Sequence, residues 1–302
     1  MSSLLTNSSA MTALQTLRNV SQNLATTQNR ISTGQRVATA SDNAAYWSIA
    51  TSMRADSAAL GAVSDSLGLS AATVDTQSTA LEQVLGNGGH SGLNKMQALL
   101  VQAKTAGVDR VKIQADISQI QQDMKNTASA ATFNGVNLLS ISAATPATTN
   151  IVSSFSRIGN TPTINTITVT TANTALYTNT QTGILDKVNG TNSIDNIDIS
   201  ALTDSAADQT KLDGFITQVV TGIGGVTNAA AGLGSIKNRI GNNTEFVKSL
   251  MDSVNRGIGQ LVDADMNAES TRLQALQVQQ QLGVQALSIA NSGSNSILGL
   301  FK

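Results

Sequence analysis

The sequence has no cysteine among its 302 residues and one histidine, His90. Without thiols, disulfide bridges and thiolate metal sites are excluded, and one histidine cannot build a metal site with several histidine ligands. Proline is nearly absent as well, since Pro146 and Pro162 are the only two and both lie in the middle of the chain. The long flanking stretches therefore permit uninterrupted helices.

Large and charged side chains are also scarce. Aromatic residues make up 3% of the chain and charged residues 12%, against about 25% charged residues in an average soluble domain. The apolar mass is Ala, Leu, Val and Ile, which suits long thin helical bundles better than a broad globular core. The formal net charge is −1, so no electrostatic attraction to nucleic acid or to anionic lipid is expected.

The sequence predicts neither a cleaved targeting signal nor a membrane-spanning segment. No run of about 18 apolar residues occurs, so the sequence predicts no membrane-spanning helix. The first residues, MSSLLTNSSAMTALQTLRN, lack a basic segment followed by an apolar one, so no cleaved secretory signal is expected. Export by a route that reads no cleavable signal remains compatible with this pattern.

What the chain does contain is heptad periodicity near both ends. Apolar residues recur at coiled-coil spacing in four stretches, and we expect each stretch to form a helix with one buried seam. The positions are Ala10, Leu14, Leu17, Leu24 and Ile31; Leu60, Val63, Leu67, Val74, Leu81 and Val84; Ile113, Ile117, Ile120 and Met124; and Ile236, Ile240, Val247, Leu250, Val254 and Leu261.

The middle of the chain has a different pattern. Residues 143–204 are dense in Thr and Asn, and TINTITVT alternates with period two, which predicts short strands. Just before it, TFNGVNLLS (132–140) predicts a hairpin with Asn134-Gly135 as its turn.

The expected last helix, at about residues 260–292, is apolar on more than one side. A nearly uncharged helix of this kind must be buried on several sides, and the N-terminal helix alone cannot cover it. The remaining cover must come from other molecules, which predicts a polymer whose subunits bury their ends against each other. The apolar residues are Leu273, Leu276, Val278, Leu282, Val284, Leu287 and Ile289.

No pattern in the chain predicts catalysis, a cofactor or a metal. Asp263, Asp265 and Asn267 have the spacing of a calcium loop, but Ala268 and Gln274 stand where that loop needs Gly and Glu, so a polar helix start is favoured. GIGGVTNAAAGLG (222–234) lacks the third Gly of a dinucleotide loop, and a flexible connector between helices is expected there.

A polar break interrupts the helical pattern near the N-terminus. The helix that reaches Ile31 is expected to end at Gly34 and to resume near Ala44, where Tyr46 and the only tryptophan, Trp47, follow. Two adjacent aromatic side chains on a helix could stack on a ligand. Packing at a junction between subunits or domains is favoured.

These segments together resemble a known family. ISTGQRVATASDNAAYWSIATSMRAD (31–56) resembles the N-terminal signature of bacterial flagellins, and GQLVDADMNAESTRLQALQVQQQLGVQALSIANSGSNSILGLFK (259–302) resembles their C-terminus. LNKMQALLVQA (93–103) and TFNGVNLL (132–139) are similar to the second helix and the hairpin that follows it. The resemblance covers about 1–142 and 205–302. Tyr46 and Trp47 stand where many flagellins carry Gly and a small apolar residue, and with the short middle they resemble the flagellins of alphaproteobacteria.

The resemblance implies a mainly α fold, with long coiled-coil helices from both chain ends in inner and middle layers and a small β-rich outer insert. Residues 1–40 with 260–302 would form the inner coiled coil, 41–142 with 205–259 the middle bundle with its hairpin, and 143–204 the outer variable domain. Gly34, Asp42, Asn43, Tyr46 and Trp47 would connect the two inner layers. Polymerisation would use Leu14, Leu17, Leu24, Ile31, Leu273, Leu276, Leu282, Leu287 and Ile289.

The implied function is a structural subunit that polymerises into the extracellular flagellar filament for swimming, without catalysis. The implied partners are the chain itself, with sister flagellins left open, the hook–filament junction and filament cap proteins, a cytoplasmic flagellin chaperone and the flagellar type III export apparatus. The alternative is a hook–filament junction protein, which shares the terminal helices but forms a short ring. An enzyme carried in the insert would need a larger insert with a metal-binding motif.

The resemblance also implies segments that host immune receptors contact. The segment equivalent to the animal-receptor site holds Asn94, Lys95, Leu99 and Asp116, where well-recognised flagellins typically carry Gln, Arg and Glu in place of Asn94, Lys95 and Asp116. Lys does not replace Arg in planar bidentate contacts. The plant-receptor segment corresponds to residues 29–50, where Asn43, Tyr46 and Trp47 depart from the well-perceived pattern. We therefore expect weak recognition by both kinds of receptor.

Overall fold

The structure is a computed structural model that describes residues 7–89, 91–141, 148–159, 161–188 and 192–299, with side chains up to residue 292 in the last helix. His90 lies outside the described residues. The described chain is 70% helical, with six helices and few strands, which confirms the expected mainly α fold. By its contacts it forms two compact units, Met1–Ala58 with Asp252–Lys302 and Ala59–Met251. Each unit is described separately.

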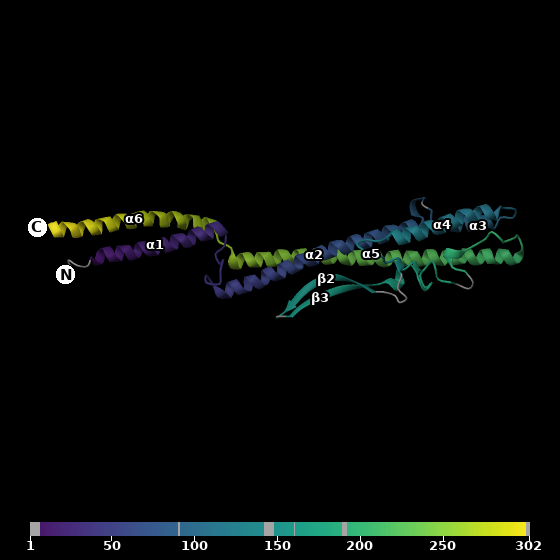
Figure 1. Ribbon diagram of the computed structural model, residues 1–302, viewed down its shortest axis with the longest axis horizontal. Helices are drawn as coiled ribbons and strands as arrows, with labels where there is room; N and C mark the ends of the chain where they lie inside the picture. The colour runs from purple at the N-terminus through teal and green to yellow at the C-terminus, as the bar shows by residue number, and fades with distance from the viewer. Residues whose placement is uncertain (1–6, 90, 142–147, 160, 189–191, 300–302) are drawn as a thin grey trace. The chain divides into compact units, whose positions relative to one another are not determined.

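The first unit is built on a pair of antiparallel helices, α1 (Ser8–Thr33) and α6 (Met266–Gly299), which lie side by side (Figure 1). Asn7 caps α1 and donates its side-chain Nδ2 to the Ala290 carbonyl at 2.9 Å. Midway along the pair, a Cβ on Gly283 would lie 3.1 Å from Leu17 Cδ1, so the two helices approach closely there. The start of α2 (Ala44–Leu85) and the end of α5 (Ala206–Val262) complete the unit.

The second unit contains the main core. It comprises the rest of α2 and α5, together with α3 (Leu93–Ala103) and α4 (Arg110–Ala130). The heptad positions predicted from the sequence are buried on α2 and α4, which confirms those two seams. On α5 Ile240 and Val247 are buried and Ile236 is half-buried. The buried residues are Leu60, Val63, Leu67, Val74, Leu81 and Val84 on α2, and Ile113, Ile117, Ile120 and Met124 on α4.

Helix α5 corrects the expectation of a flexible connector at residues 222–234, because the helix continues through them. Two of the glycines serve close packing there: a Cβ on Gly222 would lie 2.4 Å from Ile194 Cδ1, and one on Gly225 would lie 2.7 Å from Ile184 Cγ2. Glycine thus lets a neighbouring segment approach the helix backbone. The helical cost of these residues is offset by the tertiary contacts they permit.

One property of α5 differs from the sequence expectation on membrane spans. An 18-residue window of this helix has mean hydropathy 1.3, with 28% of it buried, so by length and composition α5 is long and apolar enough to cross a membrane. No unbroken apolar run marks this helix in the sequence, because Gly and Thr interrupt the apolar residues without lowering the mean hydropathy much. One such helix is weak evidence, since core helices pass the same test.

The predicted turn at Asn134-Gly135 is confirmed, but the hairpin expected over 132–140 is reduced to one bridge between Phe133 and Val136. Both residues have positive φ, 49° and 77°, as a two-residue hairpin turn of the primed type requires. Phe133 and Val136 exchange two backbone hydrogen bonds, at 3.0 and 2.9 Å. After the turn, β1 (Ser140–Ile141) pairs in parallel with β4 (Tyr177–Thr178), which fastens residues 140–141 to the middle segment.

The middle segment forms the expected strands and a compact remainder. β2 (Thr148–Ile158) and β3 (Thr161–Thr170) pair antiparallel as a two-stranded ribbon (Figure 1). Short 3-10 turns follow at η2 (Thr171–Asn173) and η3 (Ile194–Asn196), and another, η1 (Asn87–Gly89), precedes α3. Gln121 of α4 donates to the Ile194 and Ile197 carbonyls at 3.0 and 3.2 Å, so residues near 194–197 are held against the bundle.

Candidate functional site

The connector after α1 begins with a left-handed glycine. Gly34 has φ 70° and donates its N–H to the Arg30 carbonyl at 2.8 Å, which ends the helix as the sequence predicted. The chain then runs beside the end of α5. Arg36 N–H donates to the Val262 carbonyl at 2.6 Å, and Ala264 N–H donates to the Gly34 carbonyl at 2.9 Å. The two connectors of the unit are thus bonded to each other.

The second half of the connector is organised by Asp42. Its Oδ2 accepts hydrogen bonds from the Thr39 backbone N–H, the Thr39 hydroxyl and the Ala38 N–H, at 2.9, 3.0 and 3.1 Å. These bonds, the Thr39 backbone bond first, lower the pKa of the Asp42 carboxyl. Asn43 then begins α2, because its Oδ1 accepts from the Tyr46 N–H at 3.1 Å. The side chains of Asp42 and Asn43 therefore fix the backbone of the connector and the start of α2.

The acidic segment before α6 is a helix start, as the sequence predicted. Asp265 Oδ1 accepts the backbone N–H groups of Asn267 and Ala268, at 2.9 and 3.2 Å. Asp263 forms an antiparallel bridge with Gln35. In the part of the chain that the structure describes, no group of three or more His, Cys, Asp or Glu residues could hold a metal ion.

An ion pair that the sequence analysis did not single out joins the two terminal helices. Arg30 Nη1 lies 3.0 Å from Glu269 Oε1, and Glu269 is 8% exposed. Its other oxygen, Oε2, is buried without a hydrogen-bond partner among the described residues. In the sequence, the only sign of this ion pair is that Glu269 is an acidic residue in the first turn of a nearly uncharged helix. Its partner, 239 positions away, follows only from the folded pair.

Tyr46 and Trp47 lie on the first turn of α2 with exposed side chains. Their exposed fractions are 42% and 36%, and Ile49 beside them is 50% exposed. Tyr46 and Trp47 are two of the three Trp and Tyr residues in the whole chain. An aromatic pair left half uncovered at a connector is a surface on which another molecule can pack.

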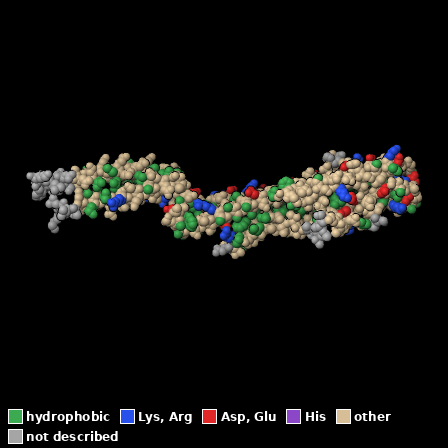
Figure 2. Space-filling model, in the orientation of Figure 1, with side chains coloured by type: hydrophobic (Ala, Val, Ile, Leu, Met, Phe, Trp, Pro, Cys, Tyr) green, Lys and Arg blue, Asp and Glu red, His purple; other side chains and the backbone are tan. Residues whose placement is uncertain are grey.

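The terminal helices bury very little against each other. In α1 only Val20 and Thr27 are buried, and in the described part of α6 only Leu276 and Glu269 are. Leu17, Leu24, Ile31, Leu273 and Leu287 are half-buried, whereas Leu14, Leu282 and Ile289 are 38%, 57% and 71% exposed. Figure 2 shows apolar side chains on the visible surface of this helix pair, with few charged ones among them. The exposed apolar set also includes Met11, Met266, Val278 and Val284.

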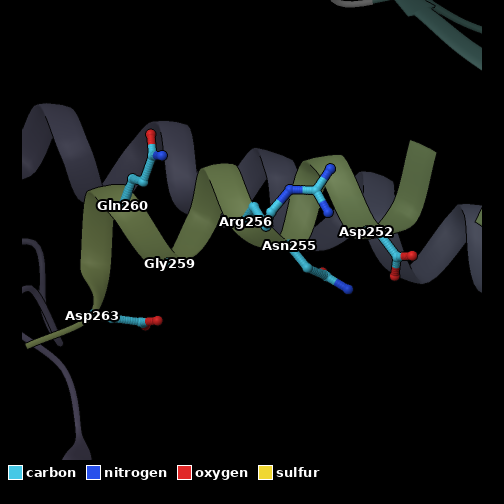
Figure 3. A pocket seen from close by; sticks show the side chains of 6 residues that line it. All are labelled: Asp252, Asn255, Arg256, Gly259, Gln260 and Asp263. Carbon is cyan, nitrogen blue, oxygen red and sulfur yellow. The ribbon is translucent and has the colours of Figure 1, made fainter. Parts of the chain in front are cut away.

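An open groove of about 520 Å³ lies along the last turns of α5 (Figure 3). Its lining side chains do not converge, since Gln260 points away from Asp263 in this view and Asn255 is bonded to Ser57 at 3.0 Å. A site for a small molecule normally has a few polar groups that point to one place. This groove does not have that arrangement. The lining residues are Asp252, Asn255, Arg256, Gly259, Gln260 and Asp263.

The segment that the resemblance relates to an animal-receptor site lies on α3 and α4 in the second unit. Asn94, Lys95 and Asp116 have exposed side chains, and Leu99 is half-buried. Asn94 Nδ2 lies 3.5 Å from Asn87 Oδ1, and no salt bridge of Lys95 or Asp116 is present among the described residues. These polar side chains are therefore available to another molecule.

Comparison with known proteins places both halves of the chain in one family. The model of the bacterial flagellin N-terminal helical region matches residues 4–144, and the model of the flagellin C-terminal helical region matches residues 216–301. The chain therefore belongs to the bacterial flagellins. This agrees with the paired terminal helices, the tight turn after α4 and the two-stranded ribbon in the middle of the chain.

Relatives that match along their whole length support the same conclusion. The chain is 44% identical over 304 residues to "Flagellin" of Brucella melitensis biotype 1, and 43% identical over 325 residues to "Flagellin C" of Rhizobium meliloti (strain 1021). "Flagellin A" of the same Rhizobium strain is 38% identical over 403 residues. Each alignment covers 100% of both chains. The resemblance to alphaproteobacterial flagellins is confirmed.

Proposed function

We propose that this chain is the structural subunit that polymerises into the helical, extracellular bacterial flagellar filament used for swimming, and that it carries out no catalysis. Membership of the flagellins supports this function. The observation that carries it is the uncovered apolar surface of the terminal helix pair, where Leu282 and Ile289 are 57% and 71% exposed. When a neighbouring copy covers such apolar surface, the assembly is stabilised by about 25 cal/mol for each Å² removed from water.

The assembly surface comprises the apolar positions of both terminal helices. In this proposal, the apolar residues of α1 pack against those of α6 and against both helices of neighbouring copies. The residues are Leu14, Leu17, Leu24 and Ile31 on α1, and Leu273, Leu276, Leu282, Leu287 and Ile289 on α6. The helix pair is nearly free of charge, so its burial carries little desolvation cost. The Arg30–Glu269 ion pair keeps its two charges together when the surface is covered.

Assembly also orders the terminal helices. Two helices of 26 and 34 residues with so few buried side chains have little tertiary stabilisation of their own. Hydrogen exchange tests this step. In free subunits the amides of 8–33 and 266–292 should exchange rapidly, those of 110–130 slowly, and in filaments all three should be protected. Equal protection of the terminal helices in free subunits and filaments would contradict the proposal.

The chain divides into three layers in this proposal, with 1–40 plus 260–302 innermost, 41–142 plus 205–259 in the middle and 143–204 outermost. The connector between the first two layers comprises Gly34, Asp42, Asn43, Tyr46 and Trp47. Gly34, Asp42 and Asn43 set its backbone, and the aromatic pair packs against a neighbouring copy. Filaments of Trp47→Ala that match the wild type in stability and shape would count against this role.

The partners in the proposal follow from a filament built outside the cell. They are further copies of the chain, the hook–filament junction and filament cap proteins at its two ends, a cytoplasmic chaperone that shields α6, and the flagellar type III export apparatus, which passes the subunit without a cleaved signal. A hook–filament junction protein is the alternative function. It is not favoured, because the full-length relatives are named flagellins.

Weak recognition by host receptors follows from the residues on α3, α4 and the connector. Asn94, Lys95 and Asp116 present shorter or less planar groups than the Gln, Arg and Glu that the resemblance associates with strong recognition. The combined change to Gln, Arg and Glu should raise activation of the animal receptor in a reporter-cell assay. Strong activation by the unchanged chain at low nanomolar concentration would refute the expectation.

The first test of the function is assembly onto short filament seeds, followed by negative-stain electron microscopy. The full chain should form long tubes, and a chain without residues 260–302 should form none. A chain with β2 and β3 deleted (148–170) is the matched control, because it removes residues outside the proposed assembly surface and should still assemble. Short rings from the full chain would favour the junction protein, and tubes from the truncated chain would refute the role of α6.

A further inference from the structure

The β2–β3 ribbon has strand edges that nothing in the described chain occupies. Among the described residues, β2 and β3 pair only with each other, over 11 and 10 residues. An exposed edge presents unpaired backbone N–H and C=O groups and is a template for another strand. An isolated two-stranded ribbon is marginally stable in water, and an added strand stabilises it.

The two strands are not equally available. The β2 edge is interrupted by a bulge between Val152 and Ser154, and Ile151 and Ser153 are buried. β3 pairs without such an interruption of its own, and eight of its ten residues are exposed, leaving only Ile167 and Val169 buried. A bulge twists an edge and ends pairing, so β3 is the strand that can accept a partner.

The β3 edge lacks the residues that normally prevent pairing. Proteins protect such edges with charged side chains, proline or bulges. Arg157 is the only charged residue in either strand, and it lies on β2 opposite Pro162, next to the turn. From Thr163 to Thr170 the strand has neither charge nor proline, and Ile164 is 61% exposed. This uncharged sequence, rich in Thr, Ile and Val, favours β-pairing.

We propose that β3 pairs with β3 of a second copy of this chain, antiparallel about a two-fold axis beside Thr166, to form a four-stranded sheet in the order β2-β3-β3-β2. The occupant follows from the sequence of the edge, since this pairing places no like charges opposite each other, sets Thr166 opposite its own copy and brings Ile164 opposite Thr168. Pairing of β3 with the β2 edge of the second copy is opposed by the bulge in β2.

The two-fold symmetry determines which copies can meet. Subunits of one polar helical filament are related by rotation about its axis and translation along it, so a two-fold contact does not join them. The β3–β3 sheet therefore links subunits of two different filaments side by side. This inference rests on the proposed filament function and adds to it a surface through which finished filaments associate.

Cysteine crosslinking tests the contact directly, because the chain has no cysteine of its own. Thr166→Cys places a thiol on the exposed face of β3, and Asn150→Cys is the matched control on the same face of β2, opposite Thr168. Filaments of tagged and untagged subunits are assembled separately, mixed and oxidised. Mixed tagged–untagged dimers on non-reducing gels then report contacts between filaments only.

The expected result is mixed dimers from Thr166→Cys at about tenfold the yield from Asn150→Cys. In a second measurement, Thr166→Lys should reduce side-by-side filaments in electron micrographs about tenfold, because the new charges face each other, whereas Asn150→Lys should leave them near the wild-type level. Equal yields from the two cysteines, no mixed dimers, or equal effects of the two lysines would overturn the proposal.

The two proposals fail in different ways. A wild-type chain that forms no filaments on seeds would refute the filament function, and oxidation of free Thr166→Cys subunits would still test β3–β3 pairing in solution. Normal filaments without mixed dimers would refute the inference alone. If Thr166→Lys failed to fold, the cysteine pair would still decide, because Cys is close to Thr in size.

Discussion

Truncation of Leu282 to Ala tests the proposed assembly surface most directly. The side chain lies on α6 and is 57% exposed in the subunit. Complete burial of a leucine side chain stabilises by about 1.5–3 kcal/mol, so covering the exposed part in the filament is worth about 1–1.5 kcal/mol. Because 1.4 kcal/mol is a factor of ten in an equilibrium constant, the critical concentration for assembly should rise about five- to tenfold.

The assay is sedimentation of filaments grown from seeds, with the soluble subunit measured at equilibrium. Gln281→Ala is the matched control, since Gln281 is the preceding, exposed and polar residue of the same helix. Its critical concentration should stay within about twofold of the wild type, as surface changes usually stay within about 0.5 kcal/mol. Leu276→Ala should have a larger effect than Leu282→Ala, because assembly orders the helix pair in which Leu276 is only 7% exposed, and a cavity would then remain there.

Two results would refute the reasoning. If Leu282→Ala filaments had the critical concentration of the Gln281→Ala control, no neighbouring copy would cover that face of α6. If Leu282→Ala instead lowered the melting temperature of free subunits, the side chain would act within the subunit and not between copies.

Four further outcomes follow from single residues. Gly34→Ala should destabilise filaments by about 1 kcal/mol in thermal dissociation, because φ at Gly34 is 70° and a side chain there is strained although space is open. Gly241→Ala, in the interior of α5 with open space around it, should stabilise by about 0.5–1 kcal/mol in thermal unfolding. Hydrogen bonds from the Thr203 hydroxyl and N–H hold the pKa of the Asp208 carboxyl well below 3.8. The ionised carboxylate therefore stabilises the fold fully above pH 3.8, and this contribution is lost as the pH falls. Asp208→Asn should reduce the loss of folding free energy between about pH 4 and pH 2 in acid-unfolding curves. Burial raises the pKa of Tyr177, whose hydroxyl has no hydrogen-bond partner among the described residues, and Tyr177→Phe should raise the melting temperature by about 2–4 °C.

Local signals in the sequence predicted the ends of elements well. Gly34 ends α1 because a left-handed residue satisfies the last carbonyls of a helix, and glycine adopts that conformation without strain. Asn134-Gly135 makes the tight turn for a related reason. Asp265 starts α6 because its carboxylate accepts free backbone N–H groups. Each of these features depends on residues a few positions apart.

The glycine-rich segment at 222–234 shows where local reasoning failed. Glycine lowers helix propensity, so the sequence favoured a connector, but Gly222 and Gly225 lie where Ile194 and Ile184 pack against α5. Those isoleucines lie more than 25 residues away in the sequence, so the contact follows from the tertiary structure alone. The helix continues because the close packing offsets the cost in propensity.

The sequence predicted only part of the candidate assembly surface. The apolar faces of the terminal helices follow from heptad spacing, and the need for outside cover follows from a helix that is apolar on several sides. Which of these side chains stay uncovered does not follow from spacing, since Leu276 is buried and Leu282 is exposed on the same helix. The pairing of Arg30 with Glu269 was also beyond the sequence, because it joins opposite ends of the chain.

The sequence by itself determined the apolar seams of α2 and α4, the end of α1 at Gly34, the turn at Asn134-Gly135 and the family, because periodicity, caps and motifs act through neighbouring residues. The tertiary structure alone decided three other features: the continuity of α5, the ion pair between the terminal helices and the availability of the β3 edge. Each of these depends on which distant segments meet and on which surfaces they leave uncovered, and burial and pairing of that kind are properties of the folded chain.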